Sequence, residues 1–118
     1  MNKRVIIAGS RTFDNFELLV ERCDYFLKNL GEVTIVSGTA RGADKLGEMY
    51  AEMREFLIKR FPADWDKYGK KAGHIRNEQM AQFAEYLILF WDGKSKGSAN
   101  MLMNAKKYNL KTKQVIYG

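Results

Sequence analysis

The sequence predicts an α/β fold: a single Rossmann-like domain with a five-stranded parallel sheet in the order 3-2-1-4-5 and helices on both faces. Five short runs, most of them rich in β-branched or aromatic residues, alternate with four segments whose apolar residues recur at helical spacing. Right-handed crossovers then leave few topologies, of which this strand order is the simplest. Because 118 residues suit one domain, residues 1–118 are expected to form a single unit.

The expected strands are short and largely apolar. The first stops at Gly9, and the second leads into a turn that contains Gly38 and Gly42. Pro62, the only proline, marks the exit from the third strand. The five expected strands are Val5–Ala8, Val33–Ser37, Leu57–Arg60, Tyr86–Phe90 and Gln114–Tyr117.

The first helix carries signals at both ends. Asp14 is expected to cap its start, with Glu17 three residues later at the spacing of a capping box, and Gly31 is a natural stop. Asp44 is expected to begin the second helix. The remaining helices are expected at His74–Glu85 and Ser98–Tyr108, with Ser98 as N-cap, and residues 63–73 read as a long loop.

Charge and composition restrict the class of protein. The net charge is +6, from 20 basic and 14 acidic residues, which favours anionic partners without separating nucleic acid from nucleotide. No apolar run approaches the roughly 18–20 residues that cross a bilayer, and the N-terminus has no apolar signal segment. Cys23, the only cysteine, falls on an apolar helix face and is expected in the core. These features predict a cytoplasmic protein without a membrane partner.

Three glycine-, serine- and threonine-rich segments are expected to meet at one edge of the sheet. In such folds ligands bind outside the carboxyl ends of the strands, where the strand order reverses. For this order the reversal lies between the first and fourth strands. The segments gathered there are Gly9–Arg11, Ser37–Asp44 and Trp91–Asn100.

The Ser37–Asp44 segment joins a buried strand to a helix N-terminus, where free N–H groups and the helix dipole attract anions. Its glycines would let the backbone curl around a phosphate, with hydroxyl donors and Arg41 adding contacts. A tight turn capped by Asp44 is the plainer reading, but it leaves Thr39 and Arg41 unexplained. The segment has neither a Walker ending nor the GxGxxG dinucleotide fingerprint.

Other residues in the same region have two readings each. Arg76, in the expected first turn of the third helix, is either a solvent-exposed side chain or a ligand contact. Trp65 and Tyr68 could stack on a base or anchor their loop to the sheet. His74 is the only histidine, and no cluster of residues has metal-ligand spacing, so no metal site is expected.

With these motifs in view, the chain resembles the SLOG superfamily, which joins DprA to the LOG phosphoribohydrolases, and within it the small stand-alone YspA-like (YpsA-related) branch. The motifs that carry the likeness are VIIAGSRTF, IVSGTARGAD, FPADWDKYGKKAG, IRNEQM and FWDGKSKGSANM. The resemblance implies a Rossmann-like fold and a pocket for a nucleotide or nucleotide-derived ligand. The ligand-binding residues that it implies are Gly9, Ser10, Arg11, Ser37, Gly38, Thr39, Arg41, Gly42, Asp44, Arg76, Asn77, Asp92, Gly93, Gly97 and Ser98.

One departure bears on catalysis. LOG enzymes carry a PGGxGTxxE loop with a catalytic glutamate, whereas this chain reads WDGKSKGSAN, with Asn100 near the position of that acid. An amide cannot act as a general acid or base. Asp44, Glu78 or Asp92 could replace it, and their spacing selects none of them.

Three functions therefore compete. The first is a binding or sensor domain for a phosphate-bearing, nucleotide-derived small molecule, for example one like ADP-ribose or NAD, with no other cofactor. The second is a hydrolase that cleaves a nucleotide at its glycosidic bond. The third is single-stranded DNA binding, as the likeness to DprA suggests, so a nucleic-acid partner ranks below a nucleotide. Related folds pair through helix faces, so a homodimer is compatible with the sequence, although no apolar stripe marks an interface.

Overall fold

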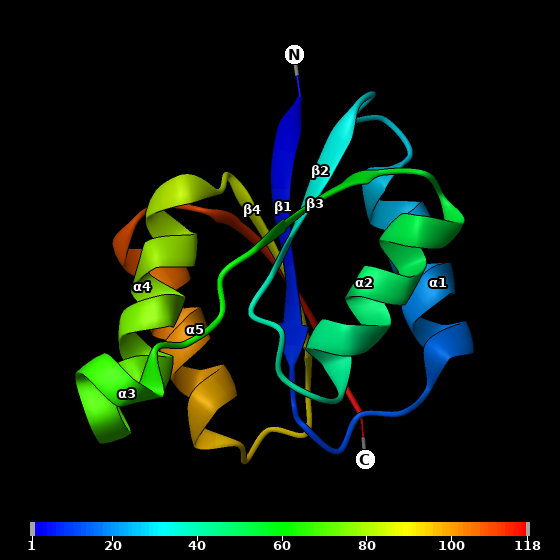
Figure 1. Cartoon of the computed structure of the whole chain (residues 1–118). Helices are drawn as coiled ribbons and strands as arrows, with labels where there is room; N and C mark the ends of the chain where they lie inside the picture. The colour runs from blue at the N-terminus through cyan, green and yellow to red at the C-terminus, as the bar shows by residue number, and fades with distance from the viewer. Residues whose placement is uncertain (1, 118) are drawn as a thin grey trace.

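A computed structural model describes residues 2–117 and contains one sheet of five parallel strands in the order β3-β2-β1-β4-β5 (Figure 1). The predicted fold class and strand order are confirmed. The boundaries agree with the expected ones at β2 and β3, and the largest shift is at β5, which begins at Lys111 rather than Gln114. The strands are β1 (Lys3–Gly9), β2 (Val33–Ser37), β3 (Leu57–Arg60), β4 (Tyr86–Trp91) and β5 (Lys111–Ile116).

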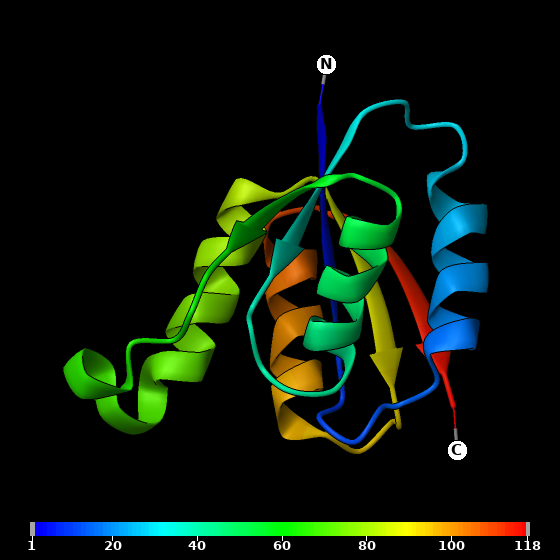
Figure 2. The ribbon, with the colours of Figure 1, turned by 45° about the vertical axis from the view of Figure 1, so that its right-hand side comes forward.

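The helices form a layer on each face of the sheet. In Figures 1 and 2, α1 and α2 cover one face, α4 and α5 cover the other, and α3 projects from the body of the molecule. No helix in residues 2–117 has both the length and the apolar character needed to span a bilayer. The helices are α1 (Phe16–Leu27), α2 (Ala43–Met53), α3 (Trp65–Tyr68), the 3₁₀ turn η1 (Gly69–Lys71), α4 (Ala72–Phe83) and α5 (Lys96–Lys107).

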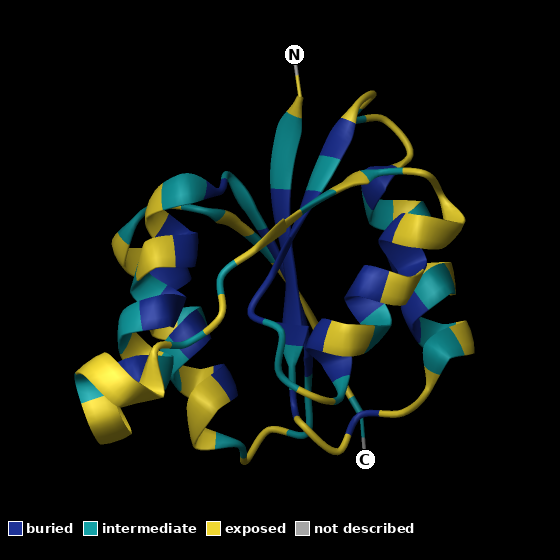
Figure 3. Ribbon diagram, viewed as in Figure 1, coloured by how far each residue is buried: buried dark blue, intermediate teal, exposed yellow. Residues whose placement is uncertain are grey.

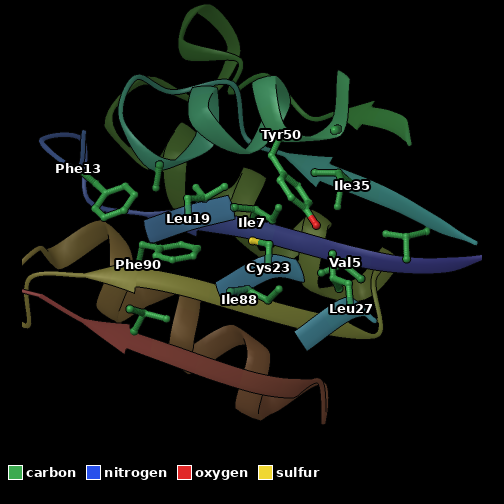
Figure 4. Packing of buried hydrophobic residues seen from close by; sticks show 14 residues of the cluster. Val5, Ile7, Phe13, Leu19, Cys23, Leu27, Ile35, Tyr50, Ile88 and Phe90 are labelled. Atoms are coloured by element: carbon green, nitrogen blue, oxygen red, sulfur yellow. The ribbon is translucent and has the colours of Figure 1, made fainter. Parts of the chain in front are cut away.

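Two hydrophobic cores lie on opposite faces of the sheet because side chains alternate along each strand. Val5 and Ile7 of β1 pack in the core under α1 and α2, which Figure 4 shows, whereas Ile6 packs with the residues under α4 and α5. The central strands are accordingly the most deeply buried part of the ribbon in Figure 3. Cys23 is fully buried in the first core, as predicted, and burial raises the pKa of its thiol.

The register brings the ends of the central strands to one level. Gly9 at the end of β1 lies opposite Phe90 of β4, and Ser37 at the end of β2 lies opposite Arg60 of β3. The backbone N–H of Ser10 then donates to the carbonyl of Phe90 at 2.9 Å. The loops that follow β1, β2 and β4 therefore share one edge of the sheet, at the bottom of Figure 1.

The start and end of α1 differ from the prediction. Asn15, not Asp14, caps the helix, because its Oδ1 accepts a hydrogen bond from the N–H of Leu18 at 3.0 Å. Glu17 is therefore the second helical residue, and the predicted capping box is wrong. The helix also ends before Gly31, which lies in the following connection with φ of 74°.

The segment expected to be a loop at residues 63–73 is mostly helical. Asp64 caps α3 by accepting a hydrogen bond from the N–H of Lys67 at 3.1 Å, and η1 leads directly into α4. That helix begins at Ala72, two residues before the predicted His74. The prediction of a loop was based on the polar composition of the segment and did not take into account that Asp64 can cap, and so stabilise, a short helical turn.

The predicted cap of α5 lies three residues too late, and the predicted first residue of α2 lies one residue too late. Ser95, not Ser98, caps α5, and its Oγ accepts from the N–H of Ser98 at 3.4 Å. At α2 the cap position is Gly42, so Asp44 is the second helical residue rather than the cap. In both cases the displaced side chain is buried instead of capping from the surface.

Candidate functional site

A cavity of about 320 Å³ opens at the carboxyl edge of the sheet, between β1 and β4. Its walls come from the end of β1, from the loops that follow β1, β2 and β4, and from helices α2, α4 and α5. We call it the inner cavity. Of the residues predicted from the sequence, it brings together Gly9, Ser10, Arg11, Asp44, Arg76, Asn77, Asp92, Gly97 and Ser98.

A second cavity, of about 340 Å³, adjoins the first. The two share Arg11, Ala40 and Arg76 as lining residues, and we call this one the outer cavity. Three more predicted residues line it, Gly38, Thr39 and Arg41, which belong to the Ser37–Asp44 segment, called the glycine-rich loop from here on.

Four predicted residues line neither cavity: Ser37, Gly42, Gly93 and Glu78. Ser37 is fully buried, and its hydroxyl donates to Glu48 Oε2 at 2.6 Å while accepting from the N–H of Thr39 at 3.0 Å. Ser37 therefore holds the loop to α2 from within instead of offering a donor to a ligand.

Gly42 also acts on the backbone of the loop. Its φ of 80° lies in the left-handed region that favours glycine. A Cβ at this position would lie 2.4 Å from the carbonyl oxygen of Ser10 and 2.5 Å from that of Arg11. The carbonyl of Ser10 also accepts from the N–H of Ala43 at 3.3 Å. Gly42 thus lets the loops after β1 and β2 touch through their backbones.

Asp44 occupies the position where an anion would bind at the start of α2. The residue is 6% exposed, and its Oδ2 accepts from the N–H of Ala40 at 3.2 Å. Burial raises the pKa of this carboxyl to about 6, although the charge of Arg76 and the bond from Ala40 act in the opposite direction. The carboxyl of Asp44, when ionised, therefore interacts favourably with the helix dipole at this end, as a bound anion would.

Arg76 lies between the two cavities. It is 8% exposed and donates through Nη1 to the carbonyl of Gly38 and through Nε to Asn77 Oδ1 at 3.0 Å. A Cβ on Gly38 would lie 2.7 Å from that Nη1 and 2.8 Å from Asp44 Oδ2, so only glycine lets the guanidinium and the carboxyl approach the loop this closely.

Because α4 begins at Ala72, Arg76 belongs to the second turn of the helix, and the predicted first-turn position is wrong. Burial lowers the pKa of the guanidinium, and Asp44 acts to raise it. An arginine in a protein nevertheless keeps its proton, so the shared wall of the two cavities carries a positive charge.

Asn77 connects α4 to α5. Its Nδ2 donates to Asn100 Oδ1 at 3.0 Å and lies 3.4 Å from the carbonyl oxygen of Gly97. Asn100 Oδ1 also accepts from Asn104 Nδ2 at 3.2 Å. Asn100, which stands near the position of the LOG glutamate, is thus part of an amide network that fixes two helices around the inner cavity.

The loop before α5 is ordered by Asp92. Its Oδ1 accepts from the N–H groups of Lys94 at 2.8 Å and Ser95 at 2.9 Å, and these bonds lower the pKa of the carboxyl. The N–H of Asp92 donates to Ser10 Oγ at 3.2 Å, which joins this loop to the one after β1. Gly93, with φ of 81°, forms the exposed tip of the loop.

Ser98, in the first turn of α5, is 3% exposed and lines the inner cavity. Its Oγ has no hydrogen-bond partner among residues 2–117. A buried hydroxyl without a partner destabilises the folded chain by about 1–3 kcal/mol. The first turn of α5 also holds no acidic residue, in contrast to that of α2.

Glu78 lies away from both cavities. Its Oε2 accepts from Tyr108 Oη at 2.6 Å and from Lys107 Nζ at 2.8 Å, and the bond from Lys107, followed by that from Tyr108, lowers the pKa of the carboxyl. Of the three acids considered for catalysis, the structure brings Asp44 and Asp92 into the inner cavity and leaves Glu78 between α4 and α5.

Sequence reasoning missed some of the lining. Met80 and Met101 line the inner cavity from α4 and α5, together with Ala8 and Thr12. Methionines on apolar helix faces carry no signal that separates a cavity wall from ordinary core. Among residues 2–117, no three His, Cys, Asp or Glu side chains are placed to hold a metal ion.

Glu48 was also missed. It is 6% exposed and joins Ser37 to Arg60, whose Nε lies 3.1 Å from Glu48 Oε1. Its position on α2, four residues after Asp44, is the only sign in the sequence that it faces the same side.

Comparison with known proteins agrees with this architecture. The chain is 33% identical over 112 residues to the Gene 61 protein of Mycobacterium phage D29, an alignment that covers 89% of this chain and 90% of that protein. The X-ray structure of DNA processing protein A (DprA) from Streptococcus pneumoniae matches the whole chain with a TM-score of 0.75 at 19% identity. This likeness concerns the fold, and the chain spans 51% of the DprA chain.

A weaker likeness, with a TM-score of 0.46 at 16% identity, is to the crystal structure of a predicted subunit of tRNA methyltransferase from Methanocaldococcus jannaschii DSM. It covers all of this chain and 69% of that one. The sequence profile of the YspA, cpYpsA-related SLOG family matches residues 3–68, which include β1, the glycine-rich loop and α2. The chain therefore belongs to the YspA, cpYpsA-related SLOG family.

Proposed function

We propose that this protein binds a nucleotide-derived small molecule in the inner cavity and holds its phosphate at the N-terminus of α5. Membership of the SLOG family suggests a nucleotide-related function. The size of the inner cavity, about 320 Å³, falls within the roughly 300–1,000 Å³ of small-molecule sites. A cavity and a group that binds phosphate are sufficient for a sensor or ligand-binding role, which needs no catalytic acid or base.

The unpartnered hydroxyl of Ser98 is the observation that carries the proposal. It is buried against the cavity at a helix end whose N–H groups and dipole favour anions. Arg76 supplies a guanidinium to the same cavity. A phosphate oxygen would accept a hydrogen bond from Ser98 Oγ and relieve its unsatisfied state.

The α5 end is a better phosphate site than the α2 end, which the glycine-rich loop suggested. At α2, the buried Asp44 carboxyl already accepts from the loop N–H of Ala40. A phosphate placed there would meet a like charge above the pKa of that acid. The first turn of α5 has no acid to repel it.

Thermal-shift measurements with a panel of nucleoside mono- and diphosphates and ribose 5-phosphate test the proposal. At least one phosphate-bearing compound should raise the melting temperature, and no response from any of them would refute binding. Without ligand, the Ser98→Ala variant should be at least as stable as the unmodified protein, because it loses a buried hydroxyl that has no partner, but it should bind the active compound about tenfold more weakly.

A matched control is Thr34→Val, which removes a hydroxyl near the amino end of the sheet. Thr34 Oγ1 donates to Asn2 Oδ1 at 2.8 Å, far from the carboxyl edge. Its affinity for the same compound should equal that of the unmodified protein. Equal loss in both variants would mean that Ser98 acts only through general stability.

Asp44 supports a second candidate function, a nucleotide N-glycosidase. A carboxyl with a pKa of about 6 inside a cavity can carry a proton near neutral pH, as a general acid must. Its proton would pass to the leaving base as the glycosidic bond breaks, and water would add its hydroxyl to the sugar carbon and release a proton to solvent. Chromatography of nucleotides incubated with the protein would reveal free base and sugar phosphate, and intact substrates throughout would leave binding alone.

A further inference from the structure

The outer cavity has a chemistry of its own. Three arginines line it, Arg11, Arg41 and Arg76, and no acidic residue is among its lining residues. Within residues 2–117, Arg11 and Arg41 take part in no ion pair. Three cations around one hollow without a carboxylate favour an anionic occupant.

Trp65 forms an aromatic wall of this cavity. The side chain is 52% exposed and belongs to neither hydrophobic core, so it does not anchor its segment to the sheet. A Cβ placed on Gly73 would lie 3.5 Å from Trp65 Cη2 and 4.0 Å from Arg76 Nη2. The indole and the guanidinium therefore flank the same point on α4.

Hydrogen bonds at both ends of α3 fix the backbone that carries the indole, which stays half exposed. Asp64 caps α3, and the N–H of Gly69 donates to the carbonyl of Trp65 at the other end of that turn. A half-exposed aromatic ring on a hydrogen-bonded turn offers a face on which a planar ring can stack. Base–aromatic stacking contributes about 1–3 kcal/mol to binding.

The sizes of the two cavities bear on the length of the ligand. Each cavity, about 320 and 340 Å³, lies near the lower end of the roughly 300–1,000 Å³ range of small-molecule sites. A compact mononucleotide would fill one of them. A ligand with a phosphate at one end and a ring at the other, joined by a second charged group, would fill both.

We propose that the outer cavity is the base-binding subsite of a nucleoside diphosphate or a longer pyrophosphate-linked nucleotide, with Trp65 stacking on the base and Arg11 and Arg41 binding the second phosphate. This proposal rests on the proposed function, because the other phosphate lies at the N-terminus of α5. Arg76, which lines both cavities, faces the pyrophosphate link between them.

The positive charge of the chain is divided between the two edges of the sheet: Lys67, Lys70 and Lys71 follow Trp65 in α3 and η1, whereas a second group of lysines lies away from the cavities. Lys106 and Lys107 end α5, and Lys111 begins β5, so these charges lie at the amino edge of the sheet, opposite the cavities. In Figure 1 the last turn of α5 and the start of β5 lie toward the upper end of the sheet, whereas α3 lies low in the view. The length of α5 therefore separates these lysines from the arginines of the outer cavity.

Isothermal titration with AMP, ADP, the other common nucleoside diphosphates and inorganic pyrophosphate tests the subsite. We expect one diphosphate to bind at least about tenfold more tightly than its monophosphate, since Arg11 and Arg41 gain a partner. Trp65→Ala should weaken that nucleotide about tenfold and leave pyrophosphate unchanged, whereas Trp65→Phe should retain most of the affinity. Arg41→Gln should weaken the diphosphate more than the monophosphate.

Tyr25→Ala is the matched control, because Tyr25 is an aromatic residue on α1, 62% exposed, and lines neither cavity. It should change no affinity. If nucleotides bind but Trp65→Ala and Arg41→Gln bind them like the unmodified protein, the subsite is refuted and the proposed function stands. If no phosphate compound binds, the proposed function fails and the subsite with it. If an oligonucleotide binds more tightly than every nucleotide, the small-molecule ligand is refuted.

Discussion

Replacing Asp44 by asparagine removes a buried titrating group and changes little else. The amide has the shape of the carboxyl and keeps an oxygen that can accept from the N–H of Ala40, as Asp44 Oδ2 does at 3.2 Å. What disappears is ionisation. The Asp44→Asn variant therefore imitates the protonated form of the natural protein at every pH.

The magnitude follows from the pKa of Asp44, which burial raises from 3.8 to about 6. Between these values the folded chain holds a proton that the unfolded chain has released. The free energy of unfolding contributed by this group is therefore fully present below pH 3.8 and is lost as the pH rises through about 6. At 1.36 kcal/mol per pKa unit, the loss is about 3 kcal/mol.

Urea unfolding of both proteins between pH 4 and pH 8 measures this loss. Their difference in unfolding free energy at pH 4 reports the change of shape and hydrogen bonding. Part of the contribution is already lost at pH 4, so relative to that value Asp44→Asn should gain about 2.4 kcal/mol by pH 7, or about 10 °C in melting temperature. The ratio of the variant's affinity for a phosphate ligand to that of the natural protein should rise as the pH rises through about 6, and taking this ratio cancels the ligand's own ionisation.

Asp92→Asn is the matched control at the same edge of the sheet. The N–H groups of Lys94 and Ser95 lower the pKa of Asp92, so its stabilising contribution is present at neutral pH and is lost as the pH falls below its ordinary range. This variant should therefore gain no stability between pH 5 and pH 7. A difference curve for Asp44→Asn that is flat over the same interval would refute a raised pKa.

Two further substitutions test the backbone and the central cation. Gly42→Ala should lower the free energy of unfolding by about 2 kcal/mol or more, because the φ of Gly42 is 80° and the new Cβ would lie 2.4 Å from the carbonyl oxygen of Ser10. Urea unfolding measures this loss. A smaller loss would mean that the loops after β1 and β2 separate easily. Arg76→Lys keeps the charge but replaces a planar fork by a single ammonium, so it should weaken binding of the active nucleotide about tenfold in titration. Because the bond from Arg76 Nε to Asn77 Oδ1 is also lost, the variant should unfold at a lower denaturant concentration, and the titration is made where it is still folded; unchanged affinity would remove the guanidinium from the site.

The sequence was sufficient for the sheet because its signals are local and repeated. The runs at Val33–Ser37 and Leu57–Arg60 form β2 and β3 with the predicted boundaries. Strand–helix alternation and right-handed crossovers then left one simple order, and the order placed three loops at one edge. The resemblance to the SLOG superfamily predicted Arg76 and Asn77 as ligand-binding residues, and both line the inner cavity.

Helix starts were predicted less well because neighbouring residues compete to cap them. Asp14 and Asn15 are both good caps, and only the geometry of the loop from β1 decides that Asn15 accepts from the helix. Ser95 and Ser98 pose the same choice at α5. There the outcome bears on the proposed function, since Ser98, which does not cap, becomes the buried hydroxyl of the inner cavity.

By itself the sequence determined the fold, the family and the edge of the sheet at which the candidate site lies, because periodicity, glycine positions and motifs are properties of the chain. Only the tertiary structure decided which side chains are free to bind. The hydroxyl of Ser37 donates to Glu48, and Asp44 is buried with a raised pKa. Ser98, in contrast, has a hydroxyl without a partner among residues 2–117. Burial and hydrogen-bond pairing depend on residues far apart in the chain, so packing alone moved the proposed phosphate site from the glycine-rich loop to α5.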